Sequence, residues 1–147
     1  ITRLQQAAKT LGVHLVMLDA KDAAHMDAAI RSISRKSGDA VLVSGDLLAL
    51  ANRDKIAQAV RKAKLPAMFP GKQYHEAGVL MSYGPDYDAA MRQAATYVDR
   101  ILKGAKPSEL PIEQISRYEL IVNLRLAREL GIEFPQTILV RADRVIR

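Results

Sequence analysis

Gly78-Val79-Leu80-Met81-Ser82-Tyr83-Gly84-Pro85 is the stretch that decides the fold of this 147-residue chain. Residues 79–83 form a short, mostly apolar run between glycines, which predicts a buried strand and not a helix. Pro85 then opens a predicted helix, because proline is accepted in a first helical turn, and Gly104 ends it. Apolar residues recur along this helix at helical spacing: Met91, Ala94, Ala95, Val98, Ile101 and Leu102.

The chain before this stretch alternates between apolar runs and amphipathic segments. The runs at residues 13–18, 40–43 and 65–69 are predicted strands, and His14 in the first of them is predicted to be a hydrogen-bonded core residue. The segments at residues 2–11, 22–38 and 46–64 are predicted helices. This alternation predicts a parallel sheet with right-handed crossovers. The predicted fold class is α/β, with a three-layer α/β/α arrangement around a mainly parallel sheet.

The chain after residue 70 departs from that alternation. The polar loop 72–78 is shorter than the dozen residues that a parallel crossover needs, so we expect the strand at 79–83 to leave the sheet. We expect the chain to return at residues 110–113 and to form a strand at residues 118–122. A short helix at residues 124–131 and a last helix opened by Pro135 complete the prediction.

Composition excludes several classes of protein. The chain has no cysteine, and none of its apolar runs approaches the ~20 residues of a membrane helix. The net charge of +6 comes largely from Arg53, Lys55, Arg61, Lys62 and Lys64. No aromatic residue interleaves with these charges, so we interpret them as the solvated face of an amphipathic helix and expect no nucleic-acid partner. The chain begins with Ile1, which is compatible with a processed or cut segment.

One long segment has a recognisable sequence. AGVLMSYGPDYDAAMRQAATYVDRILKGAKPSELPIEQ, residues 77–114, resembles the substrate-binding proteins of ABC-type importers, some of which bind tryptophan. The resemblance continues through residues 118–123, 127–131 and 141–146. It implies one lobe of a type I periplasmic-binding-protein fold, in which two α/β lobes enclose a ligand cleft. It also implies a periplasmic or membrane-anchored extracytoplasmic location.

The resemblance further implies partners for the chain: a small-molecule ligand, a membrane permease and a missing N-terminal lobe. We therefore expect residues 1–147 to be a single α/β domain, the C-terminal lobe of a two-lobed receptor. Residues 79–109 are expected to belong to or contact the missing lobe. Without that lobe, we expect this segment to fold back onto the sheet or to pair with a second copy, possibly by helix exchange.

Ligands of open parallel sheets bind at the carboxyl ends of the strands. Asp46 follows a predicted strand, and the resemblance implies that it binds a ligand amine or hydroxyl; a helix N-cap is the equal alternative. Ser44 and Gly45 are candidates for a hydroxyl contact and a close backbone approach, or form only a turn. The candidate aromatic contacts are Phe69, Tyr74 and Tyr83, with the core as the alternative for Phe69 and hinge packing for Tyr83.

No motif indicates catalysis or a cofactor. The histidines lack a second ligand at metal spacing, Ser82 lacks the G-x-S-x-G turn, and no phosphate-binding glycine motif is present. A solute receptor is therefore favoured over a flavodoxin-like enzyme. The effector-binding domain of a transcriptional regulator stays open as an alternative, because regulators share this fold.

Overall fold

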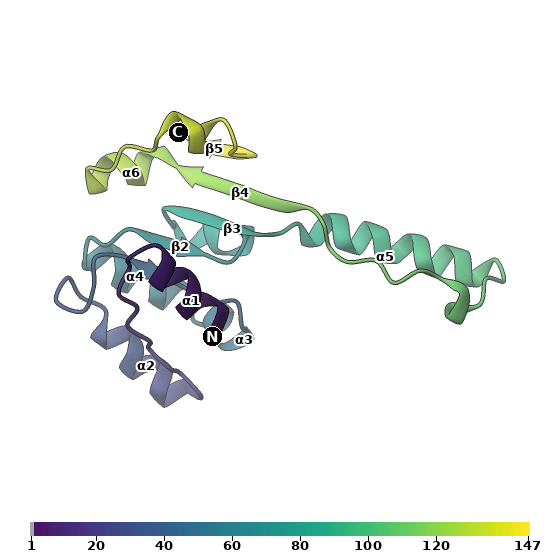
Figure 1. Cartoon of the computed structure of the whole chain (residues 1–147), viewed down its shortest axis with the longest axis horizontal. Helices are drawn as coiled ribbons and strands as arrows, with labels where there is room; N and C mark the ends of the chain where they lie inside the picture. Colours follow the sequence, from purple (N-terminus) through teal and green to yellow (C-terminus); the bar gives the residue numbers. More distant parts are fainter. Residues whose placement is uncertain (1) are drawn as a thin grey trace.

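Residues 2–147 are described by a computed structural model of the chain (Figure 1). They form a five-stranded sheet in the order β1-β2-β3-β4-β5, in which only the β3–β4 pair is antiparallel. The strands are β1 (Val41–Leu42), β2 (Ala67–Phe69), β3 (Met81–Pro85), β4 (Tyr118–Asn123) and β5 (Arg144–Ile146). The predicted α/β class with a mainly parallel sheet is confirmed.

The helices are α1 (Thr2–Thr10), α2 (Ala23–Ser32), α3 (Leu47–Ala51), α4 (Arg53–Lys62), α5 (Tyr87–Leu102), α6 (Leu124–Leu130) and α7 (Gln136–Leu139), with 3-10 helices η1 (Lys72–Ala77) and η2 (Pro107–Glu109). Carboxylates cap three of them: Asp22 accepts from the His25 N–H at 2.9 Å, Asp46 from the Ala49 N–H at 2.7 Å and Asp86 from the Ala89 N–H at 3.0 Å. The prediction of a single helix at residues 46–64 is wrong, because the segment forms two helices, α3 and α4. It divides at Asn52, whose side-chain amide donates to the Leu48 carbonyl at 2.9 Å.

The strand expected at residues 13–18 is also wrong. The segment has no strand assignment, its side chains including His14 are mostly exposed, and residues 14–18 make no backbone hydrogen bond to another described residue. A buried parallel strand needs a paired neighbour and cover on its faces, and residues 2–147 supply neither here. The apolar pattern of residues 13–18 alone therefore does not produce a strand.

The strand predicted at 79–83 does not leave the sheet. It begins later, as β3, and pairs in parallel with β2 through Met68–Met81 and Phe69–Ser82. The crossover is residues 70–80 rather than the loop 72–78, and η1 provides the regular structure within it. These eleven residues include η1 and reach the roughly 10–12 residues of the shortest parallel crossovers, which explains why the expectation failed.

Two apolar clusters hold the elements together. The larger cluster joins α2, α3, α4 and η1 to β2; its buried residues are Met26, Ala49, Ile56, Ala57, Val60, Leu65, Ala67, Phe69, Tyr74, Ala77 and Val79. The smaller cluster packs α6 onto the start of β3 through Leu80, Leu126 and Ala127. Burial of these side chains is the main stabilising contribution to the fold.

Residues 87–117, which we call the arm, extend away from the sheet (Figure 1). Helix α5 begins and ends close to the predicted residues, yet it buries none of them and does not fold back onto the sheet. The total accessible surface of 10674 Å² exceeds the roughly 7,500 Å² expected for a compact monomer of this size. The assignment of this segment to another lobe stays a prediction. None of the helices within residues 2–147 is long and apolar enough to cross a membrane.

Candidate functional site

The carboxyl ends of β1, β2 and β3 meet at one edge of the sheet, because the three strands are parallel. Residues 44–46 follow β1, and Pro70 and Gly71 follow β2. The arm leaves the sheet from the same edge, since Asp86 comes directly after β3. This edge is therefore the candidate functional site.

Backbone segments approach one another closely at this edge. A Cβ on Gly84 would lie 2.2 Å from the Pro70 carbonyl oxygen, and a Cβ on Gly45 would lie 3.3 Å from the Pro70 Cβ. Gly84 therefore has no room for a side chain, because the obstacle is backbone. The Pro70 segment is therefore closely packed against Gly84 and lies next to Gly45 of the candidate loop.

Ser44, Gly45 and Asp46 form an exposed loop at this edge. Asp46 caps α3, since its Oδ1 accepts from the Ala49 N–H at 2.7 Å. The other carboxylate oxygen has no hydrogen-bond partner within residues 2–147. Capping and ligand binding are thus compatible, because each uses a different oxygen.

Phe69 and Tyr74 lie in the larger apolar cluster, each with 1% of its surface exposed. Their ring centroids are 5.3 Å apart, so each ring packs against the other and neither presents an open face for stacking. Burial raises the pKa of the Tyr74 phenol, and the Asp46 carboxylate raises it further, while the Arg53 guanidinium lowers it.

Tyr83 lies apart from these residues. Successive strand residues face opposite sides of the sheet, so Tyr83 is directed away from its buried neighbours Ser82 and Gly84. Its side chain is 48% exposed and stacks on Tyr118 of β4, with the ring centroids 5.5 Å apart. The structure thus places Phe69 and Tyr74 in the core, leaves the loop of Ser44, Gly45 and Asp46 exposed, and places Tyr83 on the other side of β3.

Residues at the base of the arm form a charged network that the sequence did not predict. Asp86 accepts from the Ala89 N–H, which lowers its pKa, and its second oxygen is 3.4 Å from Arg117 Nε. Lys72 binds Asp88 at the start of α5, and this contact raises the lysine pKa. The partners lie far apart in sequence, so no local signal identifies them.

His75, in η1, belongs to no sequence motif, yet the structure gives it a defined partner. Its Nε2 lies 2.8 Å from the hydroxyl of the fully buried Ser82, and its Nδ1 is buried without a partner among the described residues. Burial lowers the pKa of His75 to about 4, with a smaller contribution from Arg144. Because Ser82 is inaccessible, the pair is a structural contact rather than a catalytic dyad. Its only sequence signal is the polar side chain of Ser82 within an apolar strand.

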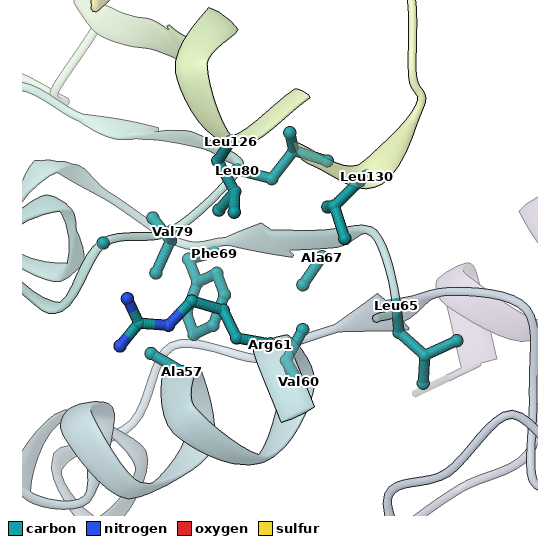
Figure 2. Close-up of a pocket in the computed structure, with 11 residues that line it drawn as sticks. Ala57, Val60, Arg61, Leu65, Ala67, Phe69, Val79, Leu80, Leu126 and Leu130 are labelled. Atoms are coloured by element: carbon teal, nitrogen blue, oxygen red, sulfur yellow. The ribbon is translucent and has the colours of Figure 1, made fainter. Parts of the chain in front are cut away.

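Two hollows lie away from this edge. Figure 2 shows a cavity between α4 and α6, lined by apolar side chains with Arg61 at its border. Its volume of about 10 Å³ holds at most one water molecule, so it is a packing void. A groove of about 480 Å³ lies within the arm, between α5 and the returning chain, and includes Ala90, Tyr97, Ile101 and Leu110. The described residues contain no cluster of three or more side chains that could hold a metal ion.

A family model described as ABC transporter substrate binding protein matches residues 1–146. A solved structure of a conserved domain protein from Vibrio cholerae is similar at a TM-score of 0.84 and 30% identity, over 98% of this chain and 48% of that one. A comparison with curated proteins gives no match.

Two further solved structures have the same fold. One is an ABC domain from Streptococcus pneumonia in complex with L-Trp, with a TM-score of 0.83 and 23% identity over 99% of this chain and 51% of that one. The other is a ligand-free, open substrate-binding protein with adhesive properties from Clostridium difficile. Its TM-score is 0.67 and its identity 21%, over 99% of this chain and 48% of that one. The chain thus spans about half the length of the solved structures it matches.

Proposed function

The chain belongs to the ABC transporter substrate-binding protein family, and from this premise we propose that it is one lobe of a solute receptor that serves an importer. The observation that carries the proposal is the family match over residues 1–146, nearly the whole chain. In this function the protein binds a solute and delivers it to a membrane permease, without catalysing a reaction. The receptor would work outside the cytoplasm, in the periplasm or anchored to the membrane.

The arm supports a two-lobed receptor. Met91 and Leu102 on α5 are 68% and 81% exposed, and an exposed apolar helix face gains free energy when another surface covers it. We propose that the arm packs on a second lobe, because solved relatives are about twice as long as this chain. Pairing of two copies through the arm is the alternative outcome for the isolated chain.

The ligand we propose is an amino acid or an aromatic carboxylate. Support comes from the solved relative in complex with L-Trp and from the exposed loop of Ser44, Gly45 and Asp46 at the sheet edge. A cleft between two lobes would enclose a molecule of this size and exclude water from its polar contacts. Phe69 and Tyr74 lie in the core beneath this loop, and Tyr83 is exposed on the opposite face of β3, so the loop supplies the proposed contacts of this edge.

A thermal-shift screen of the complete receptor that carries this chain tests the proposal. We expect amino acids or aromatic acids to raise the melting temperature, because a ligand that binds only the folded state stabilises it. Stabilisation by sugars alone would contradict the ligand class but keep the receptor function. The absence of any stabilising solute from a broad panel would contradict the receptor function itself.

A further inference from the structure

Lys72, the first residue of η1, lies between two carboxylates at the root of the arm. Its ammonium group binds Asp88 in the first turn of α5 and lies 3.9 Å from Oε2 of Glu119 on β4. The Lys72 side chain is 35% exposed, so the cation is partly shielded from water. One ammonium group is therefore shared between a carboxylate of the arm and a carboxylate of the sheet.

The two carboxylates are satisfied unequally. Asp88 is exposed and accepts the hydrogen bond of Lys72, whereas Oε2 of Glu119 is buried and has no hydrogen-bond partner among residues 2–147. A buried carboxylate oxygen without a donor is unfavourable, because it has lost its water and gained no hydrogen bond. If the ammonium group moved about 1 Å closer, Glu119 would gain a charge-assisted hydrogen bond.

The packing of the sheet fixes the position of Glu119 relative to the start of η1. Glu119 is paired with Gly84 across β3 and β4, and a Cβ on Gly84 would lie 2.2 Å from the carbonyl oxygen of Pro70. Pro70 is two residues before Lys72, so the lysine and Glu119 both adjoin this close contact. Asp88, in contrast, lies on α5, which buries no residue. Of the two ion pairs, the one with Asp88 therefore depends on the position of the arm.

Two connections join the arm to the sheet, one from β3 and one to β4. They are bound to each other, since the Asp86 N–H donates to the Arg117 carbonyl at 3.0 Å and Asp86 Oδ2 lies 3.4 Å from Arg117 Nε. Among the hydrogen bonds and ion pairs of residues 2–147, Lys72–Asp88 is the one that joins the arm to a residue outside these connections. This contact therefore restrains the arm where it leaves the sheet (Figure 1).

The arm is held together by contacts of its own. The Tyr97 hydroxyl donates to the Pro111 carbonyl at 2.6 Å, and Gln93 binds Glu113 between the same two segments. Helix α5 and the returning chain are thus tied to each other, and a movement at the root carries both of them together.

We propose that Lys72 is a two-position latch that sets the orientation of the arm. With Lys72 on Asp88, the arm is held in the orientation of this structure; with Lys72 on Glu119, it is released to a second orientation. The exchange replaces one ion pair by another, so a surface that packs on the arm selects between the two orientations at small cost. In the proposed receptor that surface is the second lobe, but the latch itself belongs to residues 2–147 and does not depend on the receptor function.

The latch is tested by single-molecule energy transfer between two dyes on the 147-residue chain. The chain has no cysteine, so two introduced cysteines take the dyes without other labelling. Lys62→Cys on α4 and Ala95→Cys on α5 are exposed positions, one on the body of the protein and one on the arm. The measurement gives the populations of the arm orientations, at dilutions where two copies do not pair.

The two carboxylates should have opposite effects on these populations. Asp88→Asn should shift the population ratio about two- to fivefold toward the second orientation, because the ion pair of the arm is lost. Glu119→Gln, added to Asp88→Asn, should move the ratio back by a similar factor, because the alternative partner is lost as well. In Lys72→Gln, neither substitution should change the ratio. Lys103→Gln is the control, since it removes an ion pair with Asp99 inside the arm, and it should keep the wild-type populations.

Two results would overturn the latch: a single arm orientation in every variant, or shifts that persist in the Lys72→Gln background. A further shift away from the wild-type ratio on adding Glu119→Gln would also overturn it. If Glu119→Gln does not fold, Asp88→Asn with and without Lys72→Gln carries the test, and equal shifts in the two backgrounds would refute the proposal. The thermal-shift screen decides the receptor function separately.

Discussion

Helices α4 and α5 are both amphipathic, but their apolar faces have different environments. Helix α4 buries Ile56, Ala57 and Val60 against β2 and η1, whereas α5 buries no residue. Both helices begin and end at recognisable signals, so local sequence explains their existence equally well. The two helices differ in what packs on the apolar face: β2 and η1 cover that of α4, and no described element covers that of α5. Periodicity identifies an apolar face, and only tertiary structure supplies its cover.

The same contrast holds between two apolar runs. Residues 67–69 form β2 between two paired neighbours, while residues 13–18 stay exposed and unpaired. A buried strand depends on hydrogen-bond partners from distant parts of the chain. We call the larger apolar cluster around β2 the covered region, and residues 13–18 and helix α5 the uncovered regions. Mutations in the two kinds of region should therefore change the free energy of unfolding by different amounts.

The largest expected effect is in the covered region. Phe69→Ala should lower the free energy of unfolding by about 3–5 kcal/mol, because it removes a fully buried ring that packs against Tyr74. Urea denaturation of the chain measures this loss. Leu47→Ala is the control, since Leu47 is 85% exposed and its removal should change stability by less than about 0.5 kcal/mol. Equal effects at both positions would refute the assigned core.

The second prediction concerns the uncovered region. Met91→Ala on α5 should change the stability of the 147-residue chain by less than about 0.5 kcal/mol. The same substitution should cost about 2–5 kcal/mol in the complete receptor, if a second lobe buries this face. Arg92→Ala is the matched control on the same helix and should be nearly neutral in both.

Denaturation of both proteins gives the comparison directly. Identical small effects of Met91→Ala in the chain and in the receptor would contradict docking of the arm on a second lobe. A large effect in the chain alone, growing with protein concentration, would instead support pairing of two copies through α5.

The third prediction tests the close packing at the candidate site. Gly84→Ala should destabilise the chain by about 1–3 kcal/mol, because the new methyl group would lie 2.2 Å from the Pro70 carbonyl oxygen. Gly38→Ala is the control, since its nearest atom would lie 3.7 Å away. Thermal unfolding of the two variants measures the difference. Equal melting temperatures would show that the Pro70 loop moves freely.

Much of the fold was predictable because its signals are local. Asp22 and Asp86 cap the helices that follow them, and Gly104 follows the end of α5 as expected. The division of α3 from α4 and the parallel pairing of β2 with β3 were not predicted. These features depend on the side-chain contact of Asn52 and on the 3-10 helix η1, which have no strong sequence pattern.

The candidate site was predictable only in part. The position of Asp46 after a strand is a local signal, and it identified a residue at the carboxyl edge of the sheet. The interpretation of Arg53 as solvated followed from its helix face, and the buried Nε is visible only in three dimensions. The position of a polar residue after a strand can be predicted from sequence, whereas the burial of a side-chain atom depends on how the helices pack.

The smallest expected effect is a pH dependence in the covered region. The pKa of His75 in the folded chain is about 4, because burial disfavours the charged imidazole, while an unfolded histidine has a pKa near 6.5. The neutral ring therefore stabilises the fold in full above pH 6.5. This contribution falls as the pH decreases toward 4, because the unfolded chain binds the proton first.

His75→Gln removes the titrating group and keeps a donor near Ser82, so its stability should fall less between pH 7 and pH 4 than that of the wild type. We expect a difference on the order of 1 kcal/mol, since the partial exposure of His75 screens the effect. Denaturation series at several pH values measure it. His14→Gln is the matched substitution at an exposed position, in residues 13–18. If the stability of His75→Gln and of the wild type changed equally with pH, His75 would have the same pKa in the folded and the unfolded chain. The packing of His75 against Ser82 of β3 would then be incorrect.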